Sequence, residues 1–417
     1  MRQKRKNMME TVVFWLMLLT PGWTLAGGSG READFTWHLS PMPRVVSART
    51  FPLSSPSFQA EVKTVMGPAC GIECQRELPA PSLSELEDAL SFETVFDNGT
   101  RTFTRARVLG LDPEQLRANS TAQGAPVRRK RHVYGTDSRF SIGDRRFLTN
   151  FPFSTAVKVS TGCSGVLVSP NHVLTAAHCV HDGRDYVKGS KKLRVGLLKV
   201  RNKGGRRGSK RSPRGAQGGG PGAGAQEHPR GRARGRRRKA AGGRRRTTEG
   251  KPTFQWTRVK STHVPGGWVR GDGAEPALGY DYALLELKRA PGRRHMELGV
   301  SPALGRLPAG GRIHFSGFDA DRAEQLVYRF CGVSDESAEL LYQYCDAEAG
   351  SAGAGVYLRL QEPGERRWTR RVVAVFSGRR WVQAHGARRD CNVAARITPL
   401  KYAQLCLWMH GNDAHCA

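Results

Sequence analysis

The chain has 417 residues and a formal charge of +31, enough length for two or three domains with a sizeable buried core. Such a charge affects solubility and the choice of partners rather than the fold. The charge is uneven, because residues 201–250 hold 17 Lys and Arg against two acidic residues, a net charge of +15. The rest of the chain is only moderately basic, so the positive charge is not spread evenly over the protein.

The first 26 residues predict a secretory signal peptide. Four basic residues precede the apolar run at 12–19, and Thr24, Leu25 and Ala26 offer a cleavage point. The alternative is a membrane anchor, but a spanning helix needs about 20 apolar residues. Thr20 ends this run early, and no later segment is long enough. We therefore expect a cleaved signal, a secreted extracellular protein and no membrane partner.

Export predicts that the nine cysteines form disulfides, because disulfides persist outside the cytosol. No paired C-x2-C spacing suggests a metal site, so we expect no metal and no cofactor. An odd count leaves one thiol free or bonded to another chain. Two sequons, at Asn98 and Asn119, predict N-glycosylation and fit the same route. The cysteines are Cys70, Cys74, Cys163, Cys179, Cys331, Cys345, Cys391, Cys406 and Cys416.

Residues 27–131 are predicted to form a pro-segment that ends in a basic processing site. The segment is polar and holds one candidate helix, over residues 82–90. Its last four residues suit a proprotein convertase, because exposed polar loops are where proteases cut. The alternative is an ordinary surface charge run. Residues 132–417 follow as a globular domain. The processing site consists of Arg128, Arg129, Lys130 and Arg131.

The globular domain is predicted to be rich in β-strands, with a helix at its end. Short runs of β-branched, aromatic and Leu residues recur between turn signals, which favours a sandwich or a barrel. Two of the runs flank the polar stretch 334–337, so a hairpin there would set Cys331 opposite Cys345 as a disulfide. Thr398 followed by Pro399 predicts a helix start. The runs are 155–160, 166–168, 193–200, 326–331, 340–344, 356–360 and 372–376.

Residues 201–250 interrupt this domain as a basic Gly/Arg-rich insert. The insert holds 14 glycines and 17 basic residues without an apolar period, so it is predicted to be disordered. One interpretation is a solvated loop without a ligand. The other is an electrostatic tether, with the clusters 236–239 and 244–246 binding sulfated glycosaminoglycans in a salt-dependent way.

The first candidate catalytic residue is His178. It lies in the sequence Leu174-Thr175-Ala176-Ala177-His178-Cys179, which follows a strand that starts at Cys163. This block resembles the histidine region of the trypsin-like serine proteases. The resemblance implies that His178 takes the general-base position. It also implies a Cys163–Cys179 disulfide under the loop. The implied fold is all-β, a trypsin-like double β-barrel with a C-terminal α-helix.

A second match to this family begins at Asp281, which opens the strand Ala283-Leu284-Leu285-Glu286-Leu287. The resemblance implies that Asp281 orients the histidine and stabilises its protonated form. An aspartate at the start of an apolar strand is common, but its place in the chain after His178 fits the family. Residues 375–378 and 392–397 resemble the substrate-binding edge strand and the C-terminal end. A plain core strand and surface helix is the alternative.

The third member of the catalytic triad is missing. The family's nucleophile lies in G-D-S-G-G-P, and the matching stretch here is Gly350-Ser351-Ala352-Gly353-Ala354. Ala352 therefore aligns with the nucleophilic serine, and a methyl group cannot attack a carbonyl. Ser351 lacks the glycines that a nucleophile elbow needs around it. The Gly350 and Ala352 N–H groups would still form an oxyanion hole, but that leaves negligible catalysis.

Activation also departs from the family. In the family, cleavage after a basic residue frees an apolar N-terminus, whose amine pairs with the aspartate beside the nucleophile. Cleavage after Arg131 would free His132, and Ser351 stands at the aspartate's position. A buried ammonium without a partner is costly. Asp346, six residues before Ala352, stands where trypsin-like members read a basic side chain, but the loop around it is too irregular to assign a specificity.

These features predict a secreted serine protease homologue without catalytic activity, which acts by binding or regulation through an unidentified protein partner. One alternative is a weak or unorthodox serine endopeptidase. Another is a polyanion-binding protein that acts through residues 201–250. An intracellular protein that binds nucleic acid is disfavoured by the signal and the cysteines.

Overall fold

The computed structural model describes ten parts of the chain, which together cover most of the predicted globular domain and part of the segment before it. The predicted signal, Asn119, the processing site and the insert lie outside these parts. Within them, no helix combines the length and the apolar character needed to cross a membrane. The described residues are 42–62, 79–111, 137–200, 252–269, 278–302, 307, 312–322, 324–361, 367–384 and 387–412.

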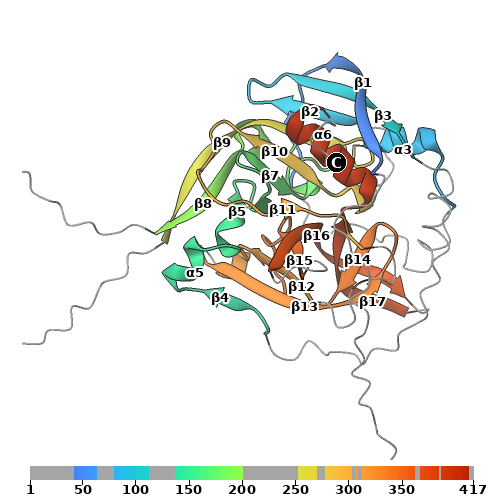
Figure 1. Ribbon diagram of the computed structural model, residues 1–417. Coiled ribbons are helices and arrows are strands. Elements are labelled where there is room, and N and C mark those ends of the chain that lie inside the picture. Colours follow the sequence, from blue (N-terminus) through green and yellow to red (C-terminus); the bar gives the residue numbers. More distant parts are fainter. Residues whose placement is uncertain are drawn as a thin grey trace, which may run out of the picture.

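Six strands form an N-terminal barrel, in the order β9-β10-β7-β6-β5-β8, which closes because β8 also pairs with β9 (Figure 1). Their inward side chains are buried Val and Leu, as expected for short strands that face a closed core. The strands are β5 Ala156–Val159, β6 Ser164–Leu167, β7 His172–Thr175, β8 Arg194–Val200, β9 Pro252–Pro265 and β10 Ala283–Leu287.

A second barrel follows in the C-terminal half, in the order β16-β15-β12-β13-β14-β17, closed by pairing of β16 with β17. Ile313, Phe315, Val356 and Phe376 lie in its core. Two short strands join its margins, β4 on β13 and β11 on β16. The strands are β4 Phe140–Ile142, β11 Glu297–Leu298, β12 Arg312–Gly317, β13 Leu326–Glu336, β14 Leu340–Gln343, β15 Gly355–Gln361, β16 Trp368–Ala384 and β17 Ala387–Arg396.

The predicted fold class, a trypsin-like double β-barrel with a C-terminal helix, is confirmed. Every predicted strand run lies inside a strand or extends beyond one by a single residue at either end, and the Cys331–Cys345 disulfide closes the β13–β14 hairpin. One detail differs: the stretch 334–337 is not the turn, because β13 continues to Glu336 and the chain reverses after it. The register Val333 with Gln343 still sets the two cysteines opposite each other.

Helix α6, Pro399–His410, begins as the sequence predicts, with the Thr398 side chain accepting from the Lys401 N–H and with Gly411 left-handed at its end. The helix over residues 82–90 also exists, as α3, Leu83–Leu90, where Ser82 and Glu85 form a capping box. Shorter helices are α5 Arg145–Thr149, η1 Phe153–Thr155, η2 Ala177–Cys179, η3 Lys188–Lys192, η4 Leu278–Tyr280 and η5 Ala320–Arg322.

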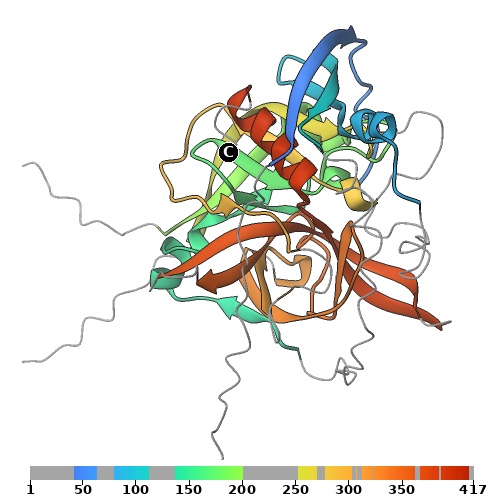
Figure 2. The same cartoon turned by 45° about the vertical axis from the view of Figure 1, so that its right-hand side comes forward.

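Residues before the predicted processing site add three strands to the N-terminal barrel's sheet, which the sequence did not predict. Strands β1 Arg44–Leu53, β2 Phe92–Phe96 and β3 Arg101–Leu109 extend the N-terminal barrel's sheet, because β2 pairs antiparallel with β9. Both views show these strands and α3 beside α6, on top of the barrel (Figures 1 and 2). The predicted boundary at residue 131 stays a prediction, but this segment is built into the same sheet as the barrel.

Buried histidines make stability depend on pH. His181 is fully buried, and burial lowers its pKa to about 4. Its Nδ1 atom accepts a hydrogen bond from the Gly183 N–H at 3.0 Å, which requires the neutral ring. Burial also lowers the pKa of His172, His263 and His314.

We predict lower thermal stability at pH 5 than at pH 7. The folded pKa of His181 lies below its unfolded value, so the unfolded chain binds more protons between about pH 6.5 and 4, and stability falls as the pH falls through this window. His181 alone accounts for about 2 kcal/mol at pH 5. Circular dichroism melting at both pH values measures the change. His181→Asn keeps an acceptor without titrating and should reduce it; equal melting temperatures for the unaltered chain would contradict the prediction.

Candidate functional site

His178 and Asp281 come together as the sequence predicts. His178 lies in η2, directly after β7, and Asp281 lies directly before β10. Strands β7 and β10 are antiparallel neighbours, with Thr175 opposite Ala283, so both residues reach the same end of the sheet. The His178 Nδ1 atom lies 2.8 Å from Oδ2 of Asp281, and the His178 backbone N–H donates to Oδ1 at 3.0 Å.

The environment of Asp281 keeps its carboxylate charged. The side chain is fully buried, which opposes ionisation, but the His178 imidazole with its hydrogen bonds and the Arg380 guanidinium outweigh this effect and lower the pKa of Asp281. A buried carboxylate that accepts from Nδ1–H fixes the orientation of the ring and leaves Nε2 as the basic nitrogen. The pair retains the geometry of an acid and base, but His178 itself is only 3% exposed.

The Cys163–Cys179 disulfide joins the start of β6 to η2, beneath the His178 loop. Nε2 of His178 lies 3.8 Å from the Cys179 sulfur, so these three side chains have the spacing of a metal-binding group. They do not fit a metal ion, because a metal needs free thiolates and these two sulfur atoms are bonded to each other. The disulfide fixes the loop and supplies no ligand.

The turn from Gly350 to Gly353 lies against this loop. Both glycines have positive φ, 96° and 84°. A Cβ at Gly353 would lie 2.3 Å from the Ser164 carbonyl oxygen and 2.3 Å from Thr175 Oγ1, so only glycine fits. The Ala352 carbonyl accepts from the Ser164 N–H at 2.8 Å. A tight elbow therefore sits directly beside the segment that leads to His178.

This elbow presents no hydroxyl to His178. Ala352 contributes a methyl group, which packs against the edge of the core. Ser351 is fully buried, and its hydroxyl donates to the Glu348 carbonyl oxygen at 2.5 Å, within its own turn. Among the described residues of the turn, Ser351 has the only hydroxyl, and this hydrogen bond holds it on the Glu348 side.

Sequence reasoning missed how the segment after the processing site is anchored. The Asp346 carboxylate accepts from both the N–H and the hydroxyl of Ser138, at 2.8 and 2.7 Å. Arg139 binds the fully buried Asp319 at 2.8 Å, and Asp319 also pairs with the fully buried Arg329 at 2.6 Å. Ser138 and Arg139 are therefore held in place by Asp346 and Asp319. Arg139 is far from the other charged residues in the sequence, and no motif there indicated that they form a cluster.

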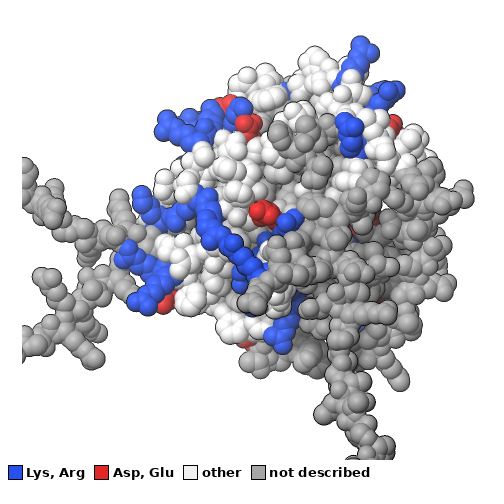
Figure 3. All heavy atoms as spheres, viewed as in Figure 1, with Lys and Arg blue, Asp and Glu red and all other residues white. Residues whose placement is uncertain are grey.

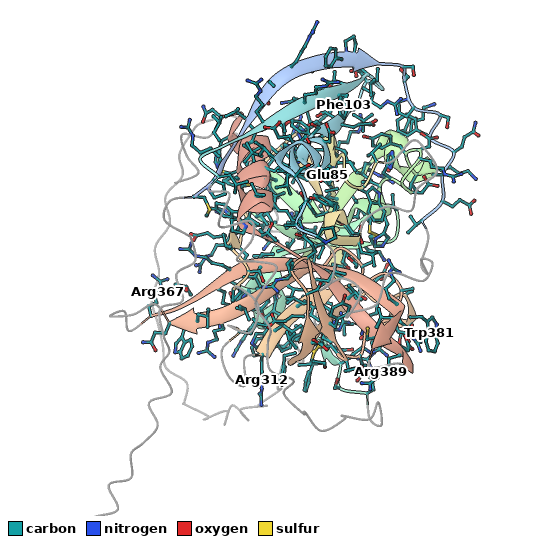
Figure 4. The ribbon with its side chains drawn as sticks, turned by 90° about the vertical axis from the view of Figure 1, so that its right-hand side faces the viewer. Glu85, Phe103, Arg312, Arg367, Trp381 and Arg389 are labelled. Carbon is teal, nitrogen blue, oxygen red and sulfur yellow. A yellow bond between two sulfur atoms is a disulfide. The ribbon has the colours of Figure 1, made fainter. Side chains whose placement is uncertain are left out.

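The strand expected at the substrate-binding edge continues into a long hairpin. Beyond Gly378, β16 keeps pairing with β17 as far as Ala384 opposite Ala387. Figure 4 shows Trp381 and Arg389 on the outer part of this hairpin. Its inward side chain Val382 packs with the cluster that Leu278 of η4 joins, directly before Asp281. The hairpin therefore contacts η4, directly before Asp281.

The remaining predicted site residues fall partly within the described chain. Asn98 is exposed in the turn between β2 and β3, where its side chain accepts from Thr100, so a glycan there would meet solvent. Cys391 is a buried free thiol whose pKa burial raises to about 12, which makes it unreactive. Cys406 is disulfide-bonded, with its partner outside the described residues.

The chain is similar in sequence to known proteins over most of its length. A family model described as Trypsin matches residues 142–212. Inactive serine protease 35 of Mus musculus is 66% identical over 98% of this chain and 100% of its own length. Serine protease 23 of Bos taurus is 45% identical over 91% of both chains. A solved Glu endopeptidase covers 66% of this chain and 97% of its own, with 17% identity and a TM-score of 0.40.

The near full-length identity to inactive serine protease 35 covers both barrels and the segment before them. Human inactive serine protease 35 gives the same result, with 66% identity over 98% of this chain. The chain therefore belongs to the trypsin-like serine protease family, as a protease homologue that is not an enzyme.

Proposed function

We propose that the chain is a secreted, extracellular protein in which Ala352 replaces the nucleophilic serine, and that it acts by binding a protein partner rather than by cleaving one. The observation that carries this proposal is the elbow from Gly350 to Gly353, where Ala352 offers a methyl group and the Ser351 hydroxyl is bound to Glu348. An acid and base remain at Asp281 and His178, but no atom is available for them to activate.

The arrangement of the hairpin supports a binding role. Arg380 is only 1% exposed and lies close enough to affect the ionisation of Asp281. His178 is also buried, with only 3% of its surface exposed. A protein partner would instead contact the exposed outer surface, including the hairpin that carries Trp381, which is 44% exposed. The two sequons and the basic quartet support passage through the secretory route, with glycosylation and convertase cleavage.

We predict that a fluorophosphonate probe does not label the purified, processed protein and that a peptide library is not cleaved. The probe reacts only with a serine activated by a neighbouring base, and none is present at this elbow. Trypsin at equal concentration is the positive control. Ser351→Ala is the matched variant, because any labelling that disappeared in it would identify Ser351 as a nucleophile and contradict the proposal.

Detection of the chain in conditioned medium tests the proposed location. Cells expressing the full chain should release a glycosylated form that becomes smaller after glycosidase treatment, and Asn98→Gln should reduce the shift. Retention of the whole population inside the cell would contradict secretion without affecting the argument about Ala352.

A further inference from the structure

The outer face of the C-terminal barrel carries arginines in a row across three neighbouring strands. Arg359 on β15 lies directly opposite Arg370 on β16. On the other side of β15, Tyr357 pairs with His314 of β12, so Arg312, two residues from His314, lies at the same end as Arg359. Neighbouring strands are about 4.8 Å apart, so the three arginines leave the backbone close together on one face of the sheet.

Like charges directly opposite each other destabilise a sheet. This row is nevertheless held in place by aromatic rings. Arg312 lies over the Phe330 ring with its guanidinium carbon 5.1 Å from the centroid, and Arg359 lies 4.7 Å over Trp368. A cation over a ring face is attracted to it and keeps its N–H groups free for another ligand. Figure 4 shows Arg312 pointing away from the body of the barrel.

The row continues toward the root of the basic insert. Arg370 and Arg294 both lie over the Phe151 ring, at 6.0 and 4.7 Å. The neighbouring Arg293 donates to the Leu198 carbonyl oxygen of β8 at 3.3 Å. Strand β8 ends at Val200, where the 17 basic residues of 201–250 begin. In the view of Figure 3, Lys and Arg side chains run across the middle of the face that is shown.

No carboxylate of the described residues pairs with Arg294, Arg312, Arg359 or Arg370, which together we call the arginine row. The pKa of His314 is lowered to about 4. Its burial is the largest cause, and the positive charges of the guanidinium groups on β12, β15 and β16 add to it. The other side chains that share this face on the same strands are uncharged. They are Phe140, His314, Tyr328, Phe330, Tyr357, Gln361 and Trp368.

We propose that the arginine row binds a linear sulfated polysaccharide of the glycosaminoglycan class, which crosses the sheet along β12, β15 and β16. Guanidinium groups match the oxygen pairs of tetrahedral oxyanions, and a row of them matches a chain of regularly spaced sulfates. The inference rests on the proposed extracellular location, where such chains are the polyanions at hand. It differs from binding by the insert alone, because it assigns the specific contacts to folded residues.

Arginine footprinting on the full chain tests this assignment while the insert is present. An arginine-selective dicarbonyl reagent is applied with and without a heparin oligosaccharide, and each peptide is quantified by mass spectrometry. We expect the modification of Arg312, Arg359 and Arg370 to slow at least fivefold. The exposed Arg184 is the internal control and should react at an unchanged rate. Protection that is equal at Arg184 and in the row would overturn the proposal.

A triple variant, Arg312→Gln, Arg359→Gln and Arg370→Gln, supplies the second readout. At physiological salt its Kd for the oligosaccharide should be at least tenfold weaker, and the slope of log Kd against log salt should fall by about two to three. The matched control removes the same charge elsewhere, by Arg184→Gln, Lys191→Gln and Lys192→Gln, and should change the Kd less than threefold.

Three outcomes would overturn the proposal: an unchanged Kd in the triple variant, an equal loss in the control variant, or equally tight binding of single-stranded DNA or of vesicles rich in phosphatidylserine. Retained circular dichroism in both variants excludes misfolding as the cause of a loss. Because the assay uses purified protein, its failure is distinct from a failure of secretion or of the inactivity assay.

Discussion

A chain whose signal is joined directly to His132, without residues 27–131, is expected not to fold. The missing segment contributes β2, which is hydrogen-bonded to β9 from Phe92 opposite Pro265 to Phe96 opposite Ser261. Its loss would leave the edge of β9 unpaired, and an open sheet edge invites aggregation. A conventional pro-segment can be discarded after cleavage, whereas residues 92–96 of the predicted pro-segment complete the sheet beside β9.

The burial of apolar side chains gives the size of the effect. Burying a side chain of this kind stabilises a fold by about 1.5–3 kcal/mol, so the group amounts to about 10–20 kcal/mol, at least comparable to the whole stability of a domain. Helix α6 would lose its cover too, because Gln404 donates to the Leu90 carbonyl and Trp408 packs against Phe92 at 5.4 Å. The buried residues of the segment are Val45, Leu86, Leu90, Phe92, Val95, Ala106 and Val108.

The measurement compares soluble yield, circular dichroism and melting temperature of the truncated and full chains. The control is the full chain cleaved at the basic quartet by a convertase, whose two fragments should co-elute in gel filtration even under reducing conditions. A truncated chain that melts within a few degrees of the full chain would contradict the prediction.

The sequence predicted the site better than its surroundings, for a physical reason. His178 and Asp281 each lie in a local motif of strand and turn, and Cys331 and Cys345 lie at matching distances from one hairpin. These relations involve neighbours in the chain. The pairing of β2 with β9 joins residues about 170 positions apart, and neither strand's own sequence specifies that partner.

Buried charge was unpredictable for a related reason. Asp319, Arg329 and Arg139 are residue types that usually lie at the surface, and only the tertiary fold brings them into one cluster. The arginine row is similar, because its members come from three strands and a loop. Composition showed the excess of positive charge, but register alone decides which arginines share a face.

The Ala352→Ser variant is expected to remain at least about a thousandfold less active than trypsin on peptide substrates. Removal of a nucleophilic serine costs about a millionfold in the subtilisin example, so a hydroxyl in a working site would restore a large rate. Here the new hydroxyl would enter a site whose His178 is 3% exposed. The hairpin of β16 and β17 also packs with Leu278 of η4, directly before Asp281.

Activation would also fail in this variant, because the position beside the new serine holds Ser351. Its hydroxyl is bound to Glu348, and no carboxylate stands there to receive a freed amine. The segment after the processing site is already anchored by Ser138 to Asp346 and by Arg139 to Asp319, so cleavage after residue 131 gives the elbow no new partner. A fluorophosphonate probe and a fluorogenic peptide panel measure the rate, with His178→Ala added to Ala352→Ser as the control. Turnover within about a thousandfold of trypsin that disappears in the control would show that the serine alone was missing, and that the burial of His178 and the anchored segment do not prevent catalysis.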